Sequence, residues 1–346
     1  MSRLTVTNKR IISISRRTDI PAFYGEWFMN RLEEGFAGWE NPFNVQKIIT
    51  SLKPDDVMAF VFWSKNYRPF IEQLKKIKES NIPVMLNYTI TGLPNIFECN
   101  LVEAEDAIES LKEIGVIFSP EHINWRYDPI VVSNVTDENY HLEKFRWLAK
   151  RLAGHVTRCY FSFAIMYGKV ERNFKKFEQE QQIKVIDLEE CQKLSLASKL
   201  TDIAQEYGIQ MYTCCGDYLR ADPRIKKAHC VDGEILEQLY PGCHKGSEKP
   251  TRKECGCTES TDIGKYDTCP HGCIYCYANI NKERAVKLHR EHDSDSAFLG
   301  FTKVDSDKCI AEIAEKERLK AEERITIPKK TKKLSAENVG QMGLGF

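Results

Sequence analysis

Short apolar runs alternate with longer amphipathic segments over the first two thirds of the chain. The apolar runs are rich in β-branched and aromatic residues, which is typical of strands buried on both faces. They lie at residues 10–15, 57–63, 84–91, 122–126, 157–165 and 209–213. The segments between them are charged and repeat their apolar positions with helical spacing, at residues 24–35, 69–80, 103–115, 137–153 and 187–207.

This regular alternation predicts parallel βαβ units and therefore an α/β fold. The number of units favours a (β/α) barrel or partial barrel over an open sheet. No glycine-rich phosphate-binding turn follows the first strand, which argues against a dinucleotide-binding sheet. We expect the barrel-like domain to occupy residues 1–213.

Polar side chains gather at the predicted carboxyl ends of these strands. In βα folds the binding and catalytic residues sit where strands end and loops begin. A single polar residue there is often structural, but a set that converges on one barrel mouth indicates a binding site. We therefore expect catalytic roles, and for Arg17 also a cofactor contact, among Arg17, Asp19, Lys65, Asn66, Arg126 and Asp128.

The character of the chain changes at Cys214. Gly, Pro, Cys, Lys and Asp dominate residues 214–290, and the apolar periodicity thins. We expect a cysteine-rich module that is held together by ligands more than by a core. The composition of residues 291–346 indicates a polar tail with one helix, at 308–324. A basic patch follows this helix and comprises Lys329, Lys330, Lys332 and Lys333. Such a patch is more often solvated than bound to nucleic acid.

Composition describes an ordinary globular protein, with 42% hydrophobic and 29% charged residues in a chain of 346. Lys plus Arg equals Asp plus Glu, 50 each, so no global field recruits nucleic acid or an anionic membrane. The first residues lack the apolar stretch of a signal peptide, and the apolar runs are too short to span a membrane. We expect a cytoplasmic protein that does not bind membranes.

Thirteen cysteines are unusual for such a protein, because clustered thiols in a reducing compartment usually serve metal or redox chemistry. Three of them, Cys269, Cys273 and Cys276, form a tight group that we name the cysteine trio. Three thiolates suit three corners of a [4Fe–4S] cluster and leave the fourth iron without a protein ligand. Such an iron can chelate S-adenosylmethionine, and Tyr275 is placed to lie against its adenine. The alternative is structural zinc.

A second group of cysteines can supply ligands for another site. The Cys255-Gly-Cys257 pair is closely spaced, and its glycine lets the backbone wrap tightly around a ligand. Together with Cys230 and one of Cys214 or Cys215, it predicts a second iron–sulfur cluster or a zinc site.

Five motifs carry a resemblance to a known family. They are residues 15–21 (Ser-Arg-Arg-Thr-Asp-Ile-Pro), 41–44 (Asn-Pro-Phe-Asn), 63–66 (Trp-Ser-Lys-Asn), 255–257 (Cys-Gly-Cys) and 269–279 (Cys-Pro-His-Gly-Cys-Ile-Tyr-Cys-Tyr-Ala-Asn). These motifs resemble an uncharacterised prokaryotic family catalogued as domain of unknown function 1848. The C-terminal cysteines of that family are similar to those of radical S-adenosylmethionine enzymes, and residues 273–277 also resemble spore photoproduct lyase and its relatives, which act on DNA.

The order of the motifs departs from that of ordinary radical enzymes, where the trio follows the first barrel strand. Here the barrel-like units come first. The resemblance therefore implies either a circular permutation, with the cluster loop folded over the barrel mouth, or an accessory module without radical chemistry.

Two functional hypotheses follow. The first is a radical S-adenosylmethionine-type enzyme that generates a 5′-deoxyadenosyl radical, acts on an unknown substrate and receives electrons from a reductant such as flavodoxin or ferredoxin. The second is a non-radical binding protein stabilised by iron–sulfur or zinc sites, with nucleic acid as one candidate ligand.

Overall fold

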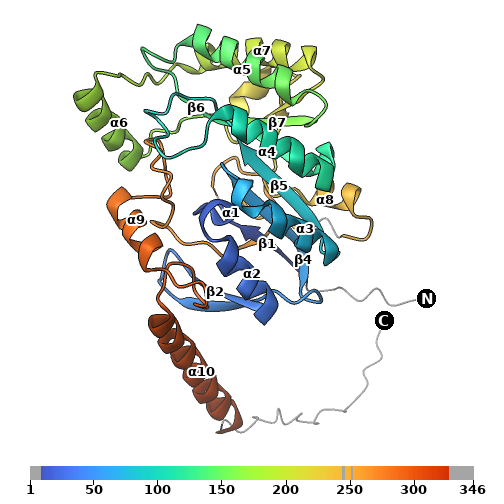
Figure 1. Cartoon of the computed structure of the whole chain (residues 1–346), viewed down its shortest axis with the longest axis vertical. Helices are drawn as coiled ribbons and strands as arrows, with labels where there is room; N and C mark the ends of the chain where they lie inside the picture. The colour runs from blue at the N-terminus through green and yellow to red at the C-terminus, as the bar shows by residue number, and fades with distance from the viewer. Residues whose placement is uncertain (1–8, 244–245, 251, 327–346) are drawn as a thin grey trace, which may run out of the picture.

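The computed structural model describes residues 9–243, 246–250 and 252–326 (Figure 1). Its centre is an eight-stranded parallel sheet with the order β10-β1-β4-β5-β6-β7-β8-β9. The strands are β1 (Arg10–Ile14), β4 (Val57–Ser64), β5 (Val84–Thr89), β6 (Ile123–Ile130), β7 (Arg158–Phe163), β8 (Gln210–Thr213), β9 (Lys226–Lys227) and β10 (Thr261–Asp262). A separate antiparallel pair consists of β2 (Phe36–Glu40) and β3 (Lys47–Ser51).

Helices connect the strands in the manner of βαβ units. The α-helices are α1 (Ile20–Phe23), α2 (Gly25–Glu34), α3 (Ile71–Glu79), α4 (Ala104–Ile117), α5 (Glu138–Leu152), α6 (Gly168–Gln181), α7 (Glu190–Glu206), α8 (Gly233–Leu239), α9 (Lys282–Glu291) and α10 (Lys303–Thr326). Short 3-10 helices are η1 (Arg68–Phe70), η2 (Pro120–His122) and η3 (Asp217–Ala221).

The predicted α/β class is confirmed by this parallel sheet. All six predicted strands are present, as β1 and β4 to β8, and the five predicted helices correspond to α2, α3, α4, α5 and α7. Closure of the sheet into a barrel is not shown. β9 and β10 are the two edges of the sheet, and no hydrogen-bonded pair joins them within the described residues. Within the described residues the sheet is therefore open, and a partial barrel stays a prediction.

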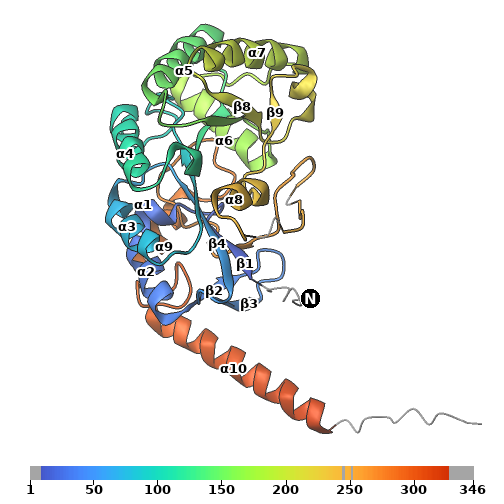
Figure 2. The same cartoon turned by 90° about the vertical axis from the view of Figure 1, so that its right-hand side faces the viewer.

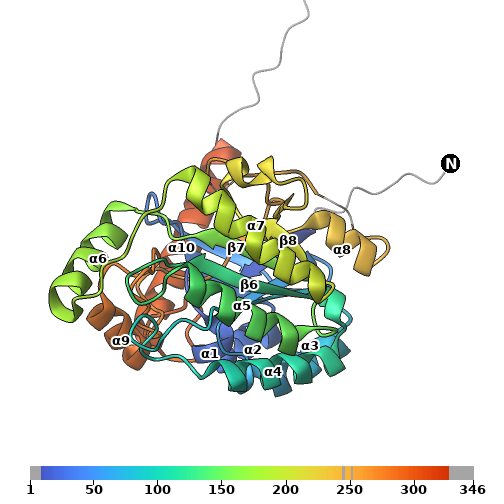
Figure 3. The same ribbon diagram turned by 90° about the horizontal axis from the view of Figure 1, so that it is seen from above.

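One face of the sheet packs against helices. Successive side chains along a strand point to opposite faces, so Ile12 and Ile14 point to the same face. Both belong to one core cluster with Leu74 of α3, Leu111 of α4 and Leu148 of α5. Viewed from above, α3, α4 and α5 lie along one side of the strands (Figure 3). Burial of each such side chain contributes about 1.5–3 kcal/mol.

The opposite face packs against the cysteine-rich segment, and we name it the cysteine face. It is formed by Ile11, Ala59, Val61, Met85 and Tyr160. Cys214, Cys230 and Cys257 are buried against these side chains, together with Leu236 of α8. The cysteine-rich segment therefore shares a core with the strands that precede it.

Residues 214–290 also extend the sheet at both edges. β9 pairs with β8, and β10 pairs with β1 in the register Ile12↔Thr261 and Ser13↔Asp262. The segment expected as a separate module thus contributes a strand to each edge, while the proposed boundary at residue 213 remains a prediction.

The end of the described chain is the long helix α10, which extends away from the body (Figure 2). It contains the helix predicted at 308–324. The basic patch of Lys329, Lys330, Lys332 and Lys333 lies outside the described residues. No helix in the part of the chain that the structure describes has the length and apolar character needed to cross a membrane.

Candidate functional site

The loop that carries the cysteine trio lies over the carboxyl ends of the central strands. His271 Nε2 is 2.7 Å from Asp19 Oδ2, in the segment that follows β1. The Ile274 amide donates to the Phe97 carbonyl at 3.0 Å, in the segment that follows β5. The loop therefore contacts the edge where the sequence places the polar residues.

Asp19 joins the ends of two strands to this loop. Its carboxylate caps α1 by accepting from the Ala22 amide at 3.0 Å. It also accepts from Ser64 Oγ at 2.7 Å and from the Lys65 amide at 2.8 Å, both at the end of β4. With His271, four donors surround one buried carboxylate, which fixes the loop relative to the sheet.

Glu98 makes a second connection between the strands and the trio loop. It accepts from Lys65 Nζ at 2.7 Å and from Thr91 Oγ1 at 2.8 Å, and the Tyr275 hydroxyl donates to it as well. Lys65 Nζ also lies 5.5 Å from the centre of the Tyr275 ring. Lys65 and Tyr275 are thus held together beside the trio, and contact of Tyr275 with adenine stays a prediction.

Burial sets the protonation of the trio thiols. It raises the pKa of Cys269 well above its ordinary value, and the negative charge of Asp19 adds to this effect. It raises the pKa of Cys273 to about 12 against the opposing effect of Lys65, and it also raises the pKa of Cys276. Burial thus disfavours the thiolate form of all three side chains, so a metal that binds them has to displace protons.

A cavity of about 320 Å³ lies beside the trio loop at the end of β5. Lys65, Thr91 and Glu98 line it on the strand side, and Tyr140 and Lys144 of α5 line it on the other. Its volume lies within the range of small-molecule sites, and its position matches the strand ends where such folds bind ligands.

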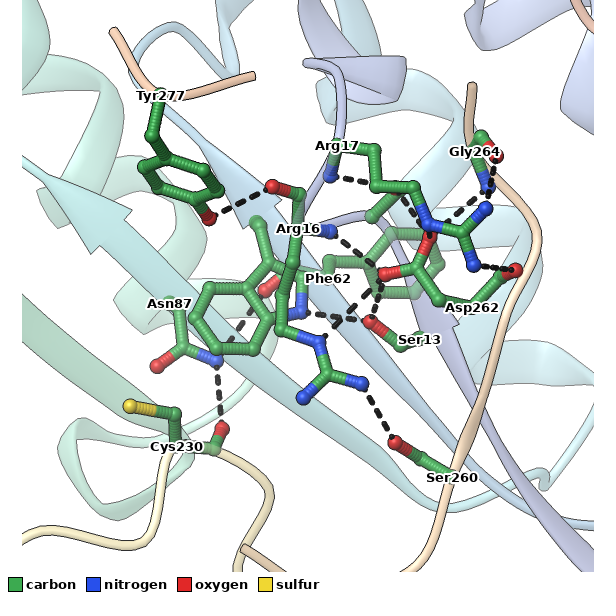
Figure 4. Close-up of polar contacts among 12 residues, drawn as sticks. Ser13, Arg16, Arg17, Phe62, Asn87, Cys230, Ser260, Asp262, Gly264 and Tyr277 are labelled. Carbon is green, nitrogen blue, oxygen red and sulfur yellow. Dashed lines mark hydrogen bonds and ion pairs between the residues drawn. The ribbon is translucent and has the colours of Figure 1, made fainter. Parts of the chain in front are cut away.

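Asp262 in β10 is the main acceptor at the β1 edge (Figure 4). Its carboxylate accepts from Ser13 Oγ at 2.8 Å and Ser15 Oγ at 2.6 Å, and it lies 3.6 Å from Arg16 Nε and 3.4 Å from Arg17 Nε. Burial acts to raise the pKa of Asp262, but the two guanidinium groups and the hydrogen bonds outweigh burial and lower it. Asp262 is therefore a buried carboxylate that fastens β10 to β1.

Arg17 donates mainly to backbone carbonyls. Its terminal nitrogens lie 3.1 Å from the Glu40 oxygen and 3.2 Å from the oxygens of both Asp262 and Gly264 (Figure 4). These contacts join the loop after β1 to the segment that leads into the trio. A direct contact of Arg17 with a cofactor stays a prediction.

Arg16 lies between the trio loop and the second group of cysteines. The Tyr277 hydroxyl donates to the Arg16 carbonyl at 2.9 Å, and Arg16 Nη2 donates to Ser260 Oγ at 3.2 Å. Figure 4 shows the side chain running from below Tyr277 toward the region of Cys230 and Ser260. Burial opposes the charge, but Asp262 and the nearby Cys257 and Cys230 thiols raise the pKa of Arg16 overall.

Arg126 and Asp128 lie on β6 near the second group of cysteines. Arg126 Nη1 lies 3.1 Å from Cys230 Sγ, and the guanidinium also pairs with Asp128. Its carbon centre lies 5.1 Å from the Trp63 ring. Asp128 accepts a further bond from Ser162. Arg126 thus contacts the second group of cysteines through Cys230, while the charge of Asp128 contributes to raising the pKa of Lys65, another of the predicted site residues.

Five predicted cysteine ligands meet on the cysteine face. Cys214 Sγ lies 3.1 Å from Cys230 Sγ, and further thiol contacts link Cys214 to Cys215, Cys230 to Cys257, and Cys257 to Cys255. We name this group the thiol row. Hydrogen bonds from Cys215 and Cys230 lower the pKa of Cys214 well below its ordinary value, whereas the bonds that Cys230 donates raise its own pKa.

The remaining predicted residue, Asn66, makes local contacts: its side chain accepts from the Arg68 amide at 3.1 Å. Sequence reasoning missed Glu98, Asp262 and Arg252, whose Nη2 lies 3.4 Å from Cys214 Sγ. Only the fold brings these residues to their partners, since Glu98 and Lys65 are separated by 33 positions and Asp262 and Ser15 by 247. Across the described residues, no group of three or more His, Cys, Asp or Glu side chains is arranged to hold a single metal ion.

An open parallel sheet with one cysteine loop at its carboxyl edge and a thiol row on one face defines a cysteine-rich α/β protein. The chain belongs to the family described as Domain of unknown function (DUF1848), which matches residues 11–278 and so includes both groups of cysteines. No curated protein matches the chain, and neither does any solved structure.

Proposed function

We propose that the chain is an iron–sulfur enzyme of the radical S-adenosylmethionine type, with a [4Fe–4S] cluster on the cysteine trio and a substrate that is unknown. The observation that carries the proposal is the position of the trio loop at the carboxyl edge of a parallel sheet, in contact with Asp19. Reactive groups of βα folds are built at this edge.

The spatial order of the elements supports a circular permutation. β10, the trio loop and α9 form a strand–loop–helix unit, and β10 pairs with β1 at the edge of the sheet. α9 packs on the helices that follow β1, with His289 centred 5.5 Å from Phe23 and 5.2 Å from Tyr24. In space, the trio thus follows an edge strand of the sheet, as it follows the first strand of the enzymes that the motif resembles.

The donor set fits such a cluster. Three soft sulfurs come from one short loop, and the buried Cys273 has the cation of Lys65 close enough to influence its pKa. When bound, the cluster would supply the electron for reductive cleavage of S-adenosylmethionine, with the electron drawn from a donor such as flavodoxin or ferredoxin. A cation near the sulfurs would offset part of the negative charge of the thiolates.

The residues of the chain itself would hold and shield this loop. His271 and Asp19 fix its first half on the ends of β1 and β4, while Glu98 holds Tyr275 and Lys65 in its second half. Asn173 of α6 covers the loop from another side by donating to the Ile274 carbonyl at 3.2 Å. Such fixed polar contacts exclude water and keep reactive groups oriented.

The test is cofactor cleavage by the full chain purified without oxygen. Incubation with S-adenosylmethionine and a chemical reductant should release 5′-deoxyadenosine and methionine. The variant with Cys269, Cys273 and Cys276 all changed to Ala should release neither, whereas Cys191→Ala, which alters an exposed cysteine of α7, should cleave like the unchanged chain. Stoichiometric zinc without sulfide in the anaerobic protein, or no nucleoside product, would overturn the proposal and favour a non-radical binding protein.

A further inference from the structure

The thiol row unites three segments that are distant in the sequence. Cys214 and Cys215 follow β8, Cys230 follows β9, and Cys255 and Cys257 precede β10. Their sulfurs form a continuous line of contacts, with 3.1 Å between Cys214 and Cys230. A set of isolated core cysteines would have no reason to converge from three segments on one another.

Two guanidinium groups approach the sulfurs of the row. Arg126 Nη1 lies 3.1 Å from Cys230 Sγ, and Arg252 Nη2 lies 3.4 Å from Cys214 Sγ. A cation beside a sulfur favours the thiolate form that an iron ligand takes, and Arg126 pairs with Asp128 as well. A cysteine that serves as a small hydrophobe is different: Cys243 packs in the same apolar cluster, and its sulfur lies 3.9 Å from the Met58 carbonyl oxygen.

We propose that the thiol row is a second iron–sulfur site, with Cys214, Cys230, Cys255 and Cys257 as the ligands of a [4Fe–4S] cluster. A single zinc ion gathers four ligands around one point, with sulfurs at about 2.3 Å, whereas in a cluster each thiolate binds its own iron. Sulfurs that contact one another pairwise along the thiol row suit the second arrangement.

The structure also distinguishes Cys214 from Cys215 as the candidate ligand. Cys214 is buried and touches both Cys230 and Cys215, so it lies within the row. Cys215 is less buried, and it contacts Cys214. We therefore assign Cys214 as the ligand. The site does not depend on the trio or on cleavage of S-adenosylmethionine.

The first experiment measures iron and acid-labile sulfide in full chains purified without oxygen. The trio variant, in which Cys269, Cys273 and Cys276 are changed to Ala, should keep about four irons and four sulfides per chain, and adding Cys230→Ala should remove them. In the otherwise unchanged chain, Cys230→Ala should lower the iron from about eight to about four per chain, and Cys243→Ala should leave it unchanged.

A matched pair tests the ligand assignment in the same measurement. Cys214→Ala should lose the second cluster, whereas Cys215→Ala should keep it. A trio variant that is folded by circular dichroism but free of iron and sulfide overturns the proposal, and so does zinc without sulfide. If the trio variant misfolds, Cys230→Ala with the trio intact still tests the proposal. Unchanged iron in that variant would overturn it. Failure to cleave S-adenosylmethionine bears on the trio alone.

Discussion

Asp262 shows how much one buried side chain contributes to this architecture. Its side chain is only 5% exposed and faces two arginines and two serines of the segment around the end of β1. β10 itself is two residues long, so its backbone pairing with β1 is slight. The carboxylate is therefore a polar attachment of the trio-bearing segment to the sheet, in addition to the one between Asp19 and His271.

Asp262→Asn should destabilise the fold by about 3 kcal/mol, because it leaves Arg16 and Arg17 without their buried counter-charge. Urea unfolding of the metal-free chain measures this difference. Asp187→Asn is a suitable control, because Asp187 is half exposed and pairs with Lys193 at the surface, where an ion pair contributes little. Equal stability of the two variants would show that Asp262 does not anchor β10.

His292 gives the fold a pH dependence of predictable sign. Its ring packs at 5.0 Å from Tyr24 and 6.2 Å from Trp27, and burial lowers the pKa of His292 to about 4. The unfolded chain, with an ordinary histidine pKa near 6.5, therefore binds protons first as the pH falls. The stability due to neutral His292 is complete above about pH 6.5 and is lost between there and about pH 4.

Between pH 7 and pH 5 this loss should amount to about 1–2 kcal/mol. Unfolding of the metal-free chain at the two pH values measures it. His292→Gln keeps an acceptor for the Gly300 amide but does not titrate in this range, so it should be less sensitive to acid than the unchanged chain. The neighbouring His289, whose pKa is also lowered by burial, remains in both proteins. An identical pH dependence would contradict the role of His292.

At the scale of elements, the unit of β10, trio loop and α9 depends on a special backbone conformation. Gly272, between the first two trio cysteines, has a φ of +73°. A Cβ at that position would lie 2.7 Å from Cys99 Sγ. The loop can thus pass close to the segment after β5 only because the residue there is glycine.

Gly272→Ala should cost about 1–3 kcal/mol and loosen the trio, with a loss of the iron bound there. Gly115→Ala provides the opposite case, since Gly115 lies inside α4 with no atom within 4 Å of its added Cβ. This variant should gain about 0.5–1 kcal/mol and keep its iron. Thermal unfolding together with iron analysis compares the two. A Gly272→Ala protein with full stability and full iron would show that the loop is not constrained in this way.

A sequence pattern predicts an element best when the element is long enough to repeat its apolar positions. β4, for example, has eight residues that are mainly apolar and buried, and such a run indicates a strand. β9 and β10 are two residues each and lie among cysteines and glycines, so no period exists to detect. The short helix α1 was missed for the same reason, whereas the pair β2 and β3 was missed because its strands are only partly buried.

The candidate site divides in the same way. Asp19 and Lys65 were found because they directly follow strands, and such positions converge in any parallel sheet. The contact of Arg126 with Cys230 could not be predicted, because it depends on the cysteine-rich segment lying over one face of the sheet. Partners such as Glu98 and Asp262 leave no local signal, since their contacts exist only in the folded chain.

At the scale of the whole molecule, the cysteine-rich segment completes a structure that the first 213 residues leave unfinished. It covers the cysteine face, adds a strand at each edge and brings the trio to the carboxyl ends of the strands. Arg16, between the trio loop and the thiol row, links the two groups of cysteines through Tyr277 and Ser260. The two proposed clusters would thus lie on one sheet, one at the carboxyl ends of its strands and the other on the cysteine face.

The most direct test of the central claim is the electron paramagnetic resonance spectrum of the reduced full chain with and without S-adenosylmethionine. If the trio holds a [4Fe–4S] cluster with one iron free of protein ligands, adding the cofactor should shift the signal of that cluster. The shift should vanish in the variant with all three trio cysteines changed to Ala and persist in Cys230→Ala. A spectrum that the cofactor leaves unchanged, or a shift that survives in the trio variant, would contradict the account.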